Sequence, residues 1–225
     1  MKTMSTTKIA IFIITLILTF SCKDVTIVET FVDKGNIFIT KSDGTIQQIT
    51  FLGKDNTPLL SPNHEVIYFI RETGNLFKNE YNYEMQQLAI MKVDLLSLRE
   101  LKLTDKIHYK DWNQSSELFR VGNFSMSDDG KYIFFLTQKW VVTDVLVRLD
   151  TDTNLMTEIS HGDGFEILKE GVFKNHLLIT RGEIKENAGR QWSYWIIDIN
   201  GNKIKEIGDE NAVKIFKENQ KEKTN

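Results

Sequence analysis

The sequence contains a single cysteine and only two prolines among its 225 residues. One cysteine cannot form an intramolecular disulfide, so the fold depends on its hydrophobic core. Scarce proline, together with 11% aromatic residues, excludes a disordered chain. An excess of basic charge is also missing, because 28 Lys and Arg stand against 31 Asp and Glu. Nucleic-acid binding is therefore not expected, since phosphate contacts need a basic face.

The sequence has one long apolar run, which extends from Ile9 to Phe20, and Lys2 and Lys8 precede it without any acidic residue. This length suits the apolar region of a signal peptide, whereas a membrane-spanning helix needs about 20 residues. Residues 1–21 are therefore interpreted as a signal peptide of an exported protein. An uncleaved membrane anchor is the alternative interpretation.

The only cysteine, Cys22, follows the small residue Ser21 and resembles the acylated cysteine of a bacterial lipobox. The pattern departs from the usual one, because Thr19 stands where leucine is common and Phe20 is bulky. A lone cysteine in an exported protein otherwise implies intermolecular pairing or a reactive thiol. The resemblance implies a palmitate-type acyl anchor on Cys22 and a place in the bacterial cell envelope, on a periplasmic or surface face. Ordinary cleavage nearby is the alternative.

The rest of the chain contains a repeat of about 50 residues. Each copy has an apolar residue, a short polar turn and an alternating stretch that ends in an apolar residue, at 39–50, 93–104, 149–160 and 197–208. Asp43-Gly44 and Asn200-Gly201 favour two-residue hairpin turns, since both residues take positive φ easily. An aspartate recurs at one equivalent place, as Asp94, Asp150 and Asp198. Each copy is predicted to form a β-hairpin.

A second type of hairpin lies between these copies, at 59–70, 124–136 and 171–180. Each has a short strand, a polar turn and a dense apolar run: Val66 to Ile70, Tyr132 to Leu136 and Leu177 to Ile179. Such short runs, bounded by turns, indicate strands that are buried on both faces. Two hairpins make four strands in about 50 residues, which is the length of a propeller blade.

The order of these signals resembles the repeats of TolB-type (WD40-like) β-propellers, and more loosely the propeller domains of prolyl-oligopeptidase-like peptidases. The matching signals, in order, are Asp43-Gly44, Ile49-Thr50, Pro58, Ser61-Pro62-Asn63 and Val66 to Ile70. Ser127 to Gly130 is a second match that lacks the proline, and the third, around Lys174-Asn175, is degenerate. The resemblance covers about residues 35–208 and implies a fold rather than a function, because propellers serve many unrelated roles.

The expected fold is an all-β propeller of about four blades over residues 22–210. Four hairpins of the first type but only three of the second are found, and Val25 to Val32 can supply one more strand. The ring is therefore expected either to close with a three-stranded blade or to stay open. Glu210 to Lys221 has helical apolar spacing, so residues 211–225 are expected to form a short helix and a frayed tail.

No catalytic motif stands out, so neither an enzyme nor a cofactor or metal site is expected. Asp150 to Asn154 begins like a calcium-binding loop, but Leu155 and His161 stand where glycine and glutamate are required. A polar hairpin turn is favoured there. His161, Asp163 and Glu166 are metal-ligand types that lie close in sequence, but the two glycines between them favour a turn between blades.

Three segments are longer than propeller turns need to be: 72–85, 105–119 and 182–191. The first two carry Phe77, Tyr81, Tyr83, Tyr109 and Trp112. These rings either cap the blades and bury apolar area, or form a binding surface, since Tyr and Trp are frequent at interface hot spots. The first functional hypothesis is a lipid-anchored envelope protein that binds another protein. The alternative is a hydrolase, lyase or ligand sensor that uses the central channel.

Overall fold

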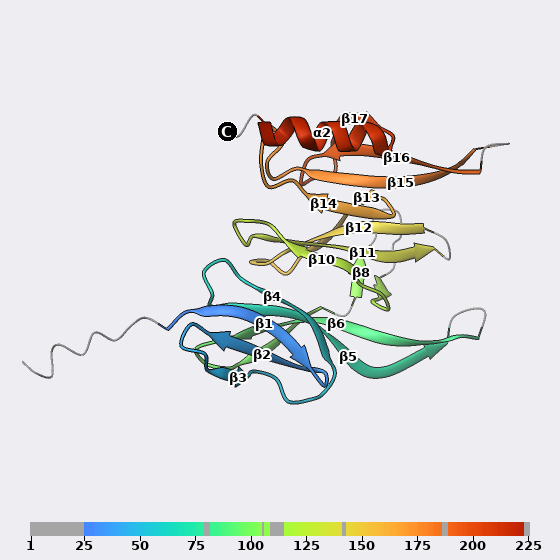
Figure 1. The fold of residues 1–225 in the computed structure, drawn as a ribbon. Helices are drawn as coiled ribbons and strands as arrows, with labels where there is room; N and C mark the ends of the chain where they lie inside the picture. Colours follow the sequence, from blue (N-terminus) through green and yellow to red (C-terminus); the bar gives the residue numbers. More distant parts are fainter. Residues whose placement is uncertain are drawn as a thin grey trace, which may run out of the picture.

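The computed structural model describes residues 25–78, 82–104, 106–108, 115–140, 143–185 and 189–222. Four antiparallel sheets are stacked one on the next, and we number them as blades in chain order (Figure 1). Blade 1 consists of β1 (Ile27–Asp33), β2 (Asn36–Lys41) and β3 (Ile46–Gln48). Blade 2 consists of β4 (Asp55–Leu60), β5 (Val66–Lys78), β6 (Glu84–Asp94) and β7 (Glu100–Thr104).

The second half of the chain repeats this plan. Blade 3 consists of β10 (Gly122–Met126), β11 (Tyr132–Trp140), β12 (Thr143–Asp150) and β13 (Met156–His161). Blade 4 consists of β14 (Gly164–Ile167), β15 (Leu177–Lys185), β16 (Gly189–Ile197) and β17 (Lys203–Gly208). A separate hairpin, β8 (Lys106–His108) with β9 (Ser115–Glu117), joins blade 2 to blade 3, and the helix α2 (Glu210–Glu222) follows blade 4.

The blades form an open propeller. Each blade is a meander, and the inner strands β1, β4, β10 and β14 contact one another in that order. Blade 1 and α2 lie at opposite ends of the stack, and within the described residues no strand of blade 1 pairs with blade 4 (Figure 1). The predicted all-β propeller is thus confirmed in its open form. Blade 1 has three strands because only β1 precedes its last hairpin, β2–β3, whereas two strands precede the last hairpin in each of the other blades.

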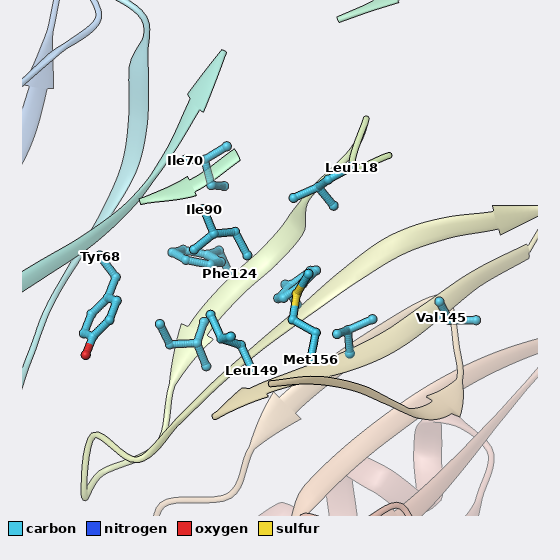
Figure 2. Close-up of a cluster of buried hydrophobic side chains, with 11 residues drawn as sticks. Tyr68, Ile70, Ile90, Leu118, Phe124, Val145, Leu149 and Met156 are labelled. Carbon is cyan, nitrogen blue, oxygen red and sulfur yellow. The ribbon is translucent and has the colours of Figure 1, made fainter. Parts of the chain in front are cut away.

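The core fills the spaces between the blades. Along β5, Ile67 and Phe69 pack toward blade 1, whereas Tyr68 and Ile70 pack toward blade 3. This confirms the prediction that the dense apolar runs are strands buried on both faces. Figure 2 shows the cluster between blades 2 and 3, which includes Tyr68, Ile70, Ile90, Leu118, Phe124, Val145, Leu149 and Met156.

The repeated aspartates cap the hairpin turns. Asp94 Oδ1 accepts hydrogen bonds from the side chain and backbone of Ser97, both at 2.7 Å, and Asp150 Oδ1 accepts one from the Thr153 backbone at 2.8 Å. These bonds favour the ionised carboxylates and hold the pKa of Asp94 and Asp150 below the ordinary value of 3.8. The calcium-loop-like segment at Asp150 is therefore a capped hairpin turn.

A second repeated contact explains the Ser-x-Asp pattern. The Ser127 hydroxyl donates to Asp129 Oδ1 at 2.7 Å and accepts from the Tyr132 backbone at 3.0 Å, which ties the two sides of the β10–β11 turn together. In blade 2 the Ser61 hydroxyl donates to Asn63 Oδ1 at the same distance of 2.7 Å. The resemblance to the propeller repeat thus rests on a hydrogen-bonded turn that two blades share.

One position of this turn holds glycine in blade 3 but a residue with a side chain in blade 2. Gly130 has φ +73°, and its counterpart His64 has φ +60°, a region that L residues with a side chain rarely adopt. We expect His64→Gly to stabilise the protein by about 0.5–1 kcal/mol, because glycine adopts this φ without strain. The gain is reduced because glycine also increases the conformational entropy of the unfolded chain. Urea unfolding measures the change, and His64→Ala, which keeps the Cβ atom, is expected to give no gain. A loss of stability in His64→Gly would contradict the prediction.

The helix α2 covers the outer face of blade 4, where a further blade would otherwise pack. Asp209 caps its N-terminus by accepting a hydrogen bond from the Ala212 backbone at 3.0 Å. Val213 and Phe216 are buried against the sheet, which confirms the predicted C-terminal helix. Among the described residues, no helix has the length and apolar content needed to cross a bilayer.

Candidate protein-binding site

The loops of the propeller fall into two groups at opposite ends of the strands. We call one the turn end: it carries the short turns from β4 to β5, from β6 to β7, and their equivalents in the other blades. We call the other the arm end: it carries the connections between blades and the hairpins β5–β6, β11–β12 and β15–β16. These hairpins reach out together on one side of the molecule (Figure 1).

The hairpins at the arm end are ribbons of paired strands rather than loops. The β5–β6 pairing continues to Lys78 and Glu84, and β15–β16 pairs as far as Lys185 and Gly189. Segments 72–85 and 182–191 are thus largely strand, although the sequence suggests long loops there. An irregularity between Glu72 and Leu76 interrupts the β5–β6 register, after which the pairing resumes. The sequence does not indicate that the pairing continues, because the alternation of apolar and polar residues also breaks at this irregularity.

Two of the predicted aromatic residues lie on the β5–β6 arm. Phe77 contacts Phe119 edge to face, with ring centroids 5.5 Å apart, and stays partly exposed. Tyr83 is 70% exposed, just before β6, and Leu76 is exposed on the same arm. Phe77 therefore covers the neighbouring segment and also presents surface to solvent. Tyr81, Tyr109 and Trp112 lie outside the described residues.

The arm end also presents apolar side chains that the sequence analysis missed. Phe51, which is 70% exposed, and Leu52 lie in the connection from blade 1 to blade 2. Trp192 is exposed on β16, and the Arg190 guanidinium lies over its ring at 4.5 Å from the centroid. The sequence offers two weak signals for these residues: two adjacent apolar residues in a short connection, and a tryptophan in a long hairpin. Neither signal indicates a shared surface until the topology places both at the same end of the molecule.

Two ion pairs lie beside these apolar groups, between blades 3 and 4. Arg120 Nη1 is 3.2 Å from Asp144 Oδ1, and Arg190 Nη2 is 2.5 Å from Asp163 Oδ1. Burial raises the pKa of Asp144 above its ordinary value, the charge of Arg120 lowers it, and the charge of Asp163 adds to the rise. Exposed rings bordered by arginines match the composition of protein interfaces, in which aromatic residues and arginine are enriched.

The three candidate metal ligands from the sequence take separate partners. Asp163 accepts hydrogen bonds from the Gly182 backbone and from Arg190, whereas Glu166 pairs with Lys217 of α2. His161 Nε2 lies 3.8 Å from a carboxylate oxygen of another residue, Glu158. The part of the chain that the structure describes contains no group of three or more such side chains placed to hold a metal ion.

A cavity lies between the inner strands, where the propeller axis runs. Its volume is about 520 Å³, and its walls come from β4, β10, β14 and the residues that follow β14, with Leu59, Phe124 and Phe165 among its apolar lining. Among the described lining residues, Glu166 is the one carboxylate, and it is paired with Lys217. Lys169 lines the cavity as well, and acid–base catalysis there would need it or another group to converge with Glu166 on a substrate.

The fold defines the protein as a β-propeller, and solved structures of other β-propeller proteins are similar to it. The propeller domain of the trilobed protease from Pyrococcus furiosus aligns with a TM-score of 0.53 at 12% identity, covering 82% of this chain and 58% of that one. Oligogalacturonate lyase from Vibrio parahaemolyticus aligns with a TM-score of 0.50 at 14% identity, covering 78% and 46%. TolB from Acinetobacter baumannii aligns with a TM-score of 0.47 at 15% identity, covering 83% and 41%.

These comparisons bear on the fold alone. No protein-family model matches the chain, and no curated protein matches it in sequence. The chain spans between 41% and 58% of the length of the three structural neighbours. At such identities the activities of the peptidases and of the lyase do not carry over to this protein.

Proposed function

We propose that this protein is a lipid-anchored component of a bacterial cell envelope that binds another protein through the arm end of its propeller. The observation that carries the proposal is the gathering of exposed apolar side chains at that end: Phe51, Leu52, Leu76, Phe77, Tyr83 and Trp192. Aromatic residues of this kind dominate the binding energy of protein interfaces. They are presented by ribbons on a rigid stack of sheets, which lowers the entropy cost of binding.

The arm of blade 2 also offers backbone hydrogen-bonding groups. The pairing of β4 with β5 ends at Asp55 and Arg71, and that of β6 with β7 ends at Ile90 and Thr104. Beyond these points the Glu72 backbone donates to the Lys54 carbonyl at 3.0 Å and the Leu88 backbone to the Leu118 carbonyl at 2.6 Å. Farther along the arm, no third strand of the described residues pairs with β5 or β6. An extended segment of a partner protein can add to such an edge, with backbone bonds supplying affinity and the neighbouring rings supplying specificity.

The lipid anchor is supported by the sequence and by the start of the fold. Cys22 is the sole cysteine, it follows a run that suits a signal peptide, and β1 begins at Ile27. The propeller thus starts directly after the proposed acylation site, with few residues between them.

The test is in-cell cross-linking of the tagged protein, followed by capture from solubilised envelope and mass spectrometry. We expect a stoichiometric partner whose recovery falls at least about tenfold in Phe77→Ser/Tyr83→Ser/Trp192→Ser, since hot-spot residues each contribute about 2 kcal/mol or more. Ile215→Ser, which removes an exposed apolar side chain from α2, is the matched control and is expected to retain the partner.

Urea unfolding of each purified variant confirms that the triple variant still folds. Equal recovery from the triple variant and the wild type would refute binding through the arm end. Capture of no protein by the wild type would refute the protein-binding role itself. A Cys22→Ser sample that still fractionates with the membrane would refute the lipid anchor.

The central cavity supports a second candidate, a sensor that binds a small ligand. About 520 Å³ falls within the range of about 300–1,000 Å³ that ligand sites occupy, and apolar walls with a few polar groups are typical of such sites. Asn123 and Ser125 of β10 would supply the polar contacts. A hydrolase or lyase in the same cavity would need Lys169 and Glu166 to converge on one substrate, whereas Glu166 pairs with Lys217, so the sensor is the better-supported use.

A further inference from the structure

The chain enters the propeller at the turn end. Ile27, the first residue of β1, pairs with Lys41, the last residue of β2, beside the turn that leads into β3. The opposite end of β1 leads to Gly35, whose carbonyl accepts a hydrogen bond from the Asp55 backbone at 2.8 Å, at the arm end of blade 2. Figure 1 shows β1 starting on one side of the stack and the arms reaching out on the other.

The distance from Cys22 to Ile27 is limited by the length of the chain between them. Five residue steps of at most about 3.6 Å each allow no more than about 18 Å, even for a fully extended chain. If Cys22 carries the acyl anchor proposed above, on which this inference rests, the start of β1 stays within that distance of the bilayer surface. The turn end is therefore the end of the propeller that the tether holds nearest to the lipid.

The tips of the turns at this end carry exposed aliphatic side chains. Leu96 is 97% exposed, and it is joined by Leu98, Leu155 and Val172, so that blades 2, 3 and 4 each contribute at least one; Val28 is exposed near the start of β1. Turn tips are usually polar, and glycine, asparagine and serine predominate there. A single exposed leucine needs no explanation, but a set of them at one end, nearest the anchor, indicates an apolar contact surface.

The turn end also carries charged side chains of both signs, such as Glu65, Arg99 and Asp152. Within the β10–β11 turn, Lys131 lies 4.0 Å from the Asp129 carboxylate, so the two charges offset each other. The neighbouring β6–β7 and β12–β13 turns bind their own aspartates, Asp94 and Asp150, through turn hydrogen bonds. The chain as a whole is acidic, with 28 Lys and Arg against 31 Asp and Glu, so attachment through this end is expected to depend on apolar contact rather than on attraction to anionic lipid.

We propose that the turn end of the propeller lies on the bilayer surface, with Leu96, Leu98, Leu155 and Val172 among the lipid headgroups. This assigns a lipid-contact surface to the turns and leaves the arm end for a protein partner. The acyl chain holds the molecule at the membrane, and the turn tips fix which way it faces.

Site-specific quenching tests this orientation. Because Cys22 is the only cysteine and acylation blocks it, Leu96→Cys and Glu84→Cys each create one thiol for a fluorescent label, at the turn end and at the arm end. The acylated proteins are reconstituted into phosphatidylcholine vesicles that contain lipid with a nitroxide near the headgroup. Interfacial side chains lie about 5–10 Å deep, so quenching at position 96 is expected to be at least about threefold stronger than at position 84.

The controls separate this inference from the anchor itself. Flotation of the acylated protein with vesicles, lost in Cys22→Ser, together with equal quenching at both positions, would overturn the orientation and leave the anchor intact. Flotation that is unchanged in Cys22→Ser would refute the anchor and the tether argument with it. Protection of the label at position 96 from a water-soluble quencher, without quenching by nitroxide lipid, would show that protein covers the turns and would also overturn the proposal.

Discussion

Replacing Gly201 with alanine is expected to destabilise the protein by about 4 kcal/mol, which is near the upper limit for a single substitution. Gly201 has φ +89°, and a Cβ atom at this position would lie 2.0 Å from the Ile159 carbonyl oxygen of β13. The position of the Cβ atom is fixed by the backbone of residue 201, and the oxygen belongs to the backbone of Ile159. The contact can therefore be relieved only if blades 3 and 4 move apart. Arg148 holds the same turn from blade 3, since its Nη1 donates to the Ile199 carbonyl at 3.0 Å and to Asn200 Oδ1 at 2.6 Å.

Gly44 provides a matched control for this prediction. It has a similar φ of +85°, but a Cβ atom there would meet nothing within 4 Å. Gly44→Ala is therefore expected to cost only the conformational strain, about 1–2 kcal/mol. Urea unfolding of the two variants gives both values, and their difference measures the close approach of blades 3 and 4. Equal losses in the two variants would show that the blades part easily at this point.

Arg71→Met is expected to destabilise the protein by about 3–5 kcal/mol, because it leaves a buried carboxylate without its partner. The Asp55 side chain is fully buried, and Arg71 binds it with two bonds, Nε to Oδ1 at 2.5 Å and Nη2 to Oδ2 at 2.8 Å. The remaining Nη1 donates to Glu100 at 2.5 Å. The hydrogen bond with Asp55 raises the pKa of the guanidinium further above its ordinary value, so Arg71 stays charged.

The control for Arg71 is a more exposed ion pair at the same end of the molecule. The Arg120 side chain is 59% exposed and that of its partner Asp144 is 14% exposed, so Arg120→Met is expected to cost less than Arg71→Met, about 1–2 kcal/mol. Asp55→Asn/Arg71→Met, which removes both charges, is expected to recover part of the loss. If Arg71→Met were no worse than Arg120→Met in urea unfolding, the Asp55 carboxylate would not need its partner.

The sequence predicts the blades because their signals are local. Hairpin turns such as Asn200-Gly201, aspartate caps such as Asp150, and dense apolar runs such as Val66 to Ile70 each act within a few residues. The openness of the ring could not be settled in this way. It depends on contacts between distant segments, such as Val213 and Phe216 of α2 against Leu178 and Ile196 of blade 4.

The candidate site was predictable only in part. Phe77 and Tyr83 stand out because they lie in a segment too long for a propeller turn. Phe51 and Trp192 belong to other blades, and only the stacking of those blades brings them to the same end. Sequence spacing carries no information about that stacking, since the distances between blades are set by core packing.

The helix α2 has a consequence for self-association. A stack of blades has two ends, and α2 closes the blade 4 end with an outer side that is polar and charged apart from Ile215. At the other end of the stack, which is blade 1 (Figure 1), Phe31 and Phe38 stack with ring centroids 5.4 Å apart on the face opposite to Ile37 and Ile39, which pack toward blade 2. A molecule in which only the blade 1 end of the stack is available can associate through it only with the blade 1 end of a second copy. Any assembly through this face therefore stops at a symmetric pair and cannot grow into a fibre.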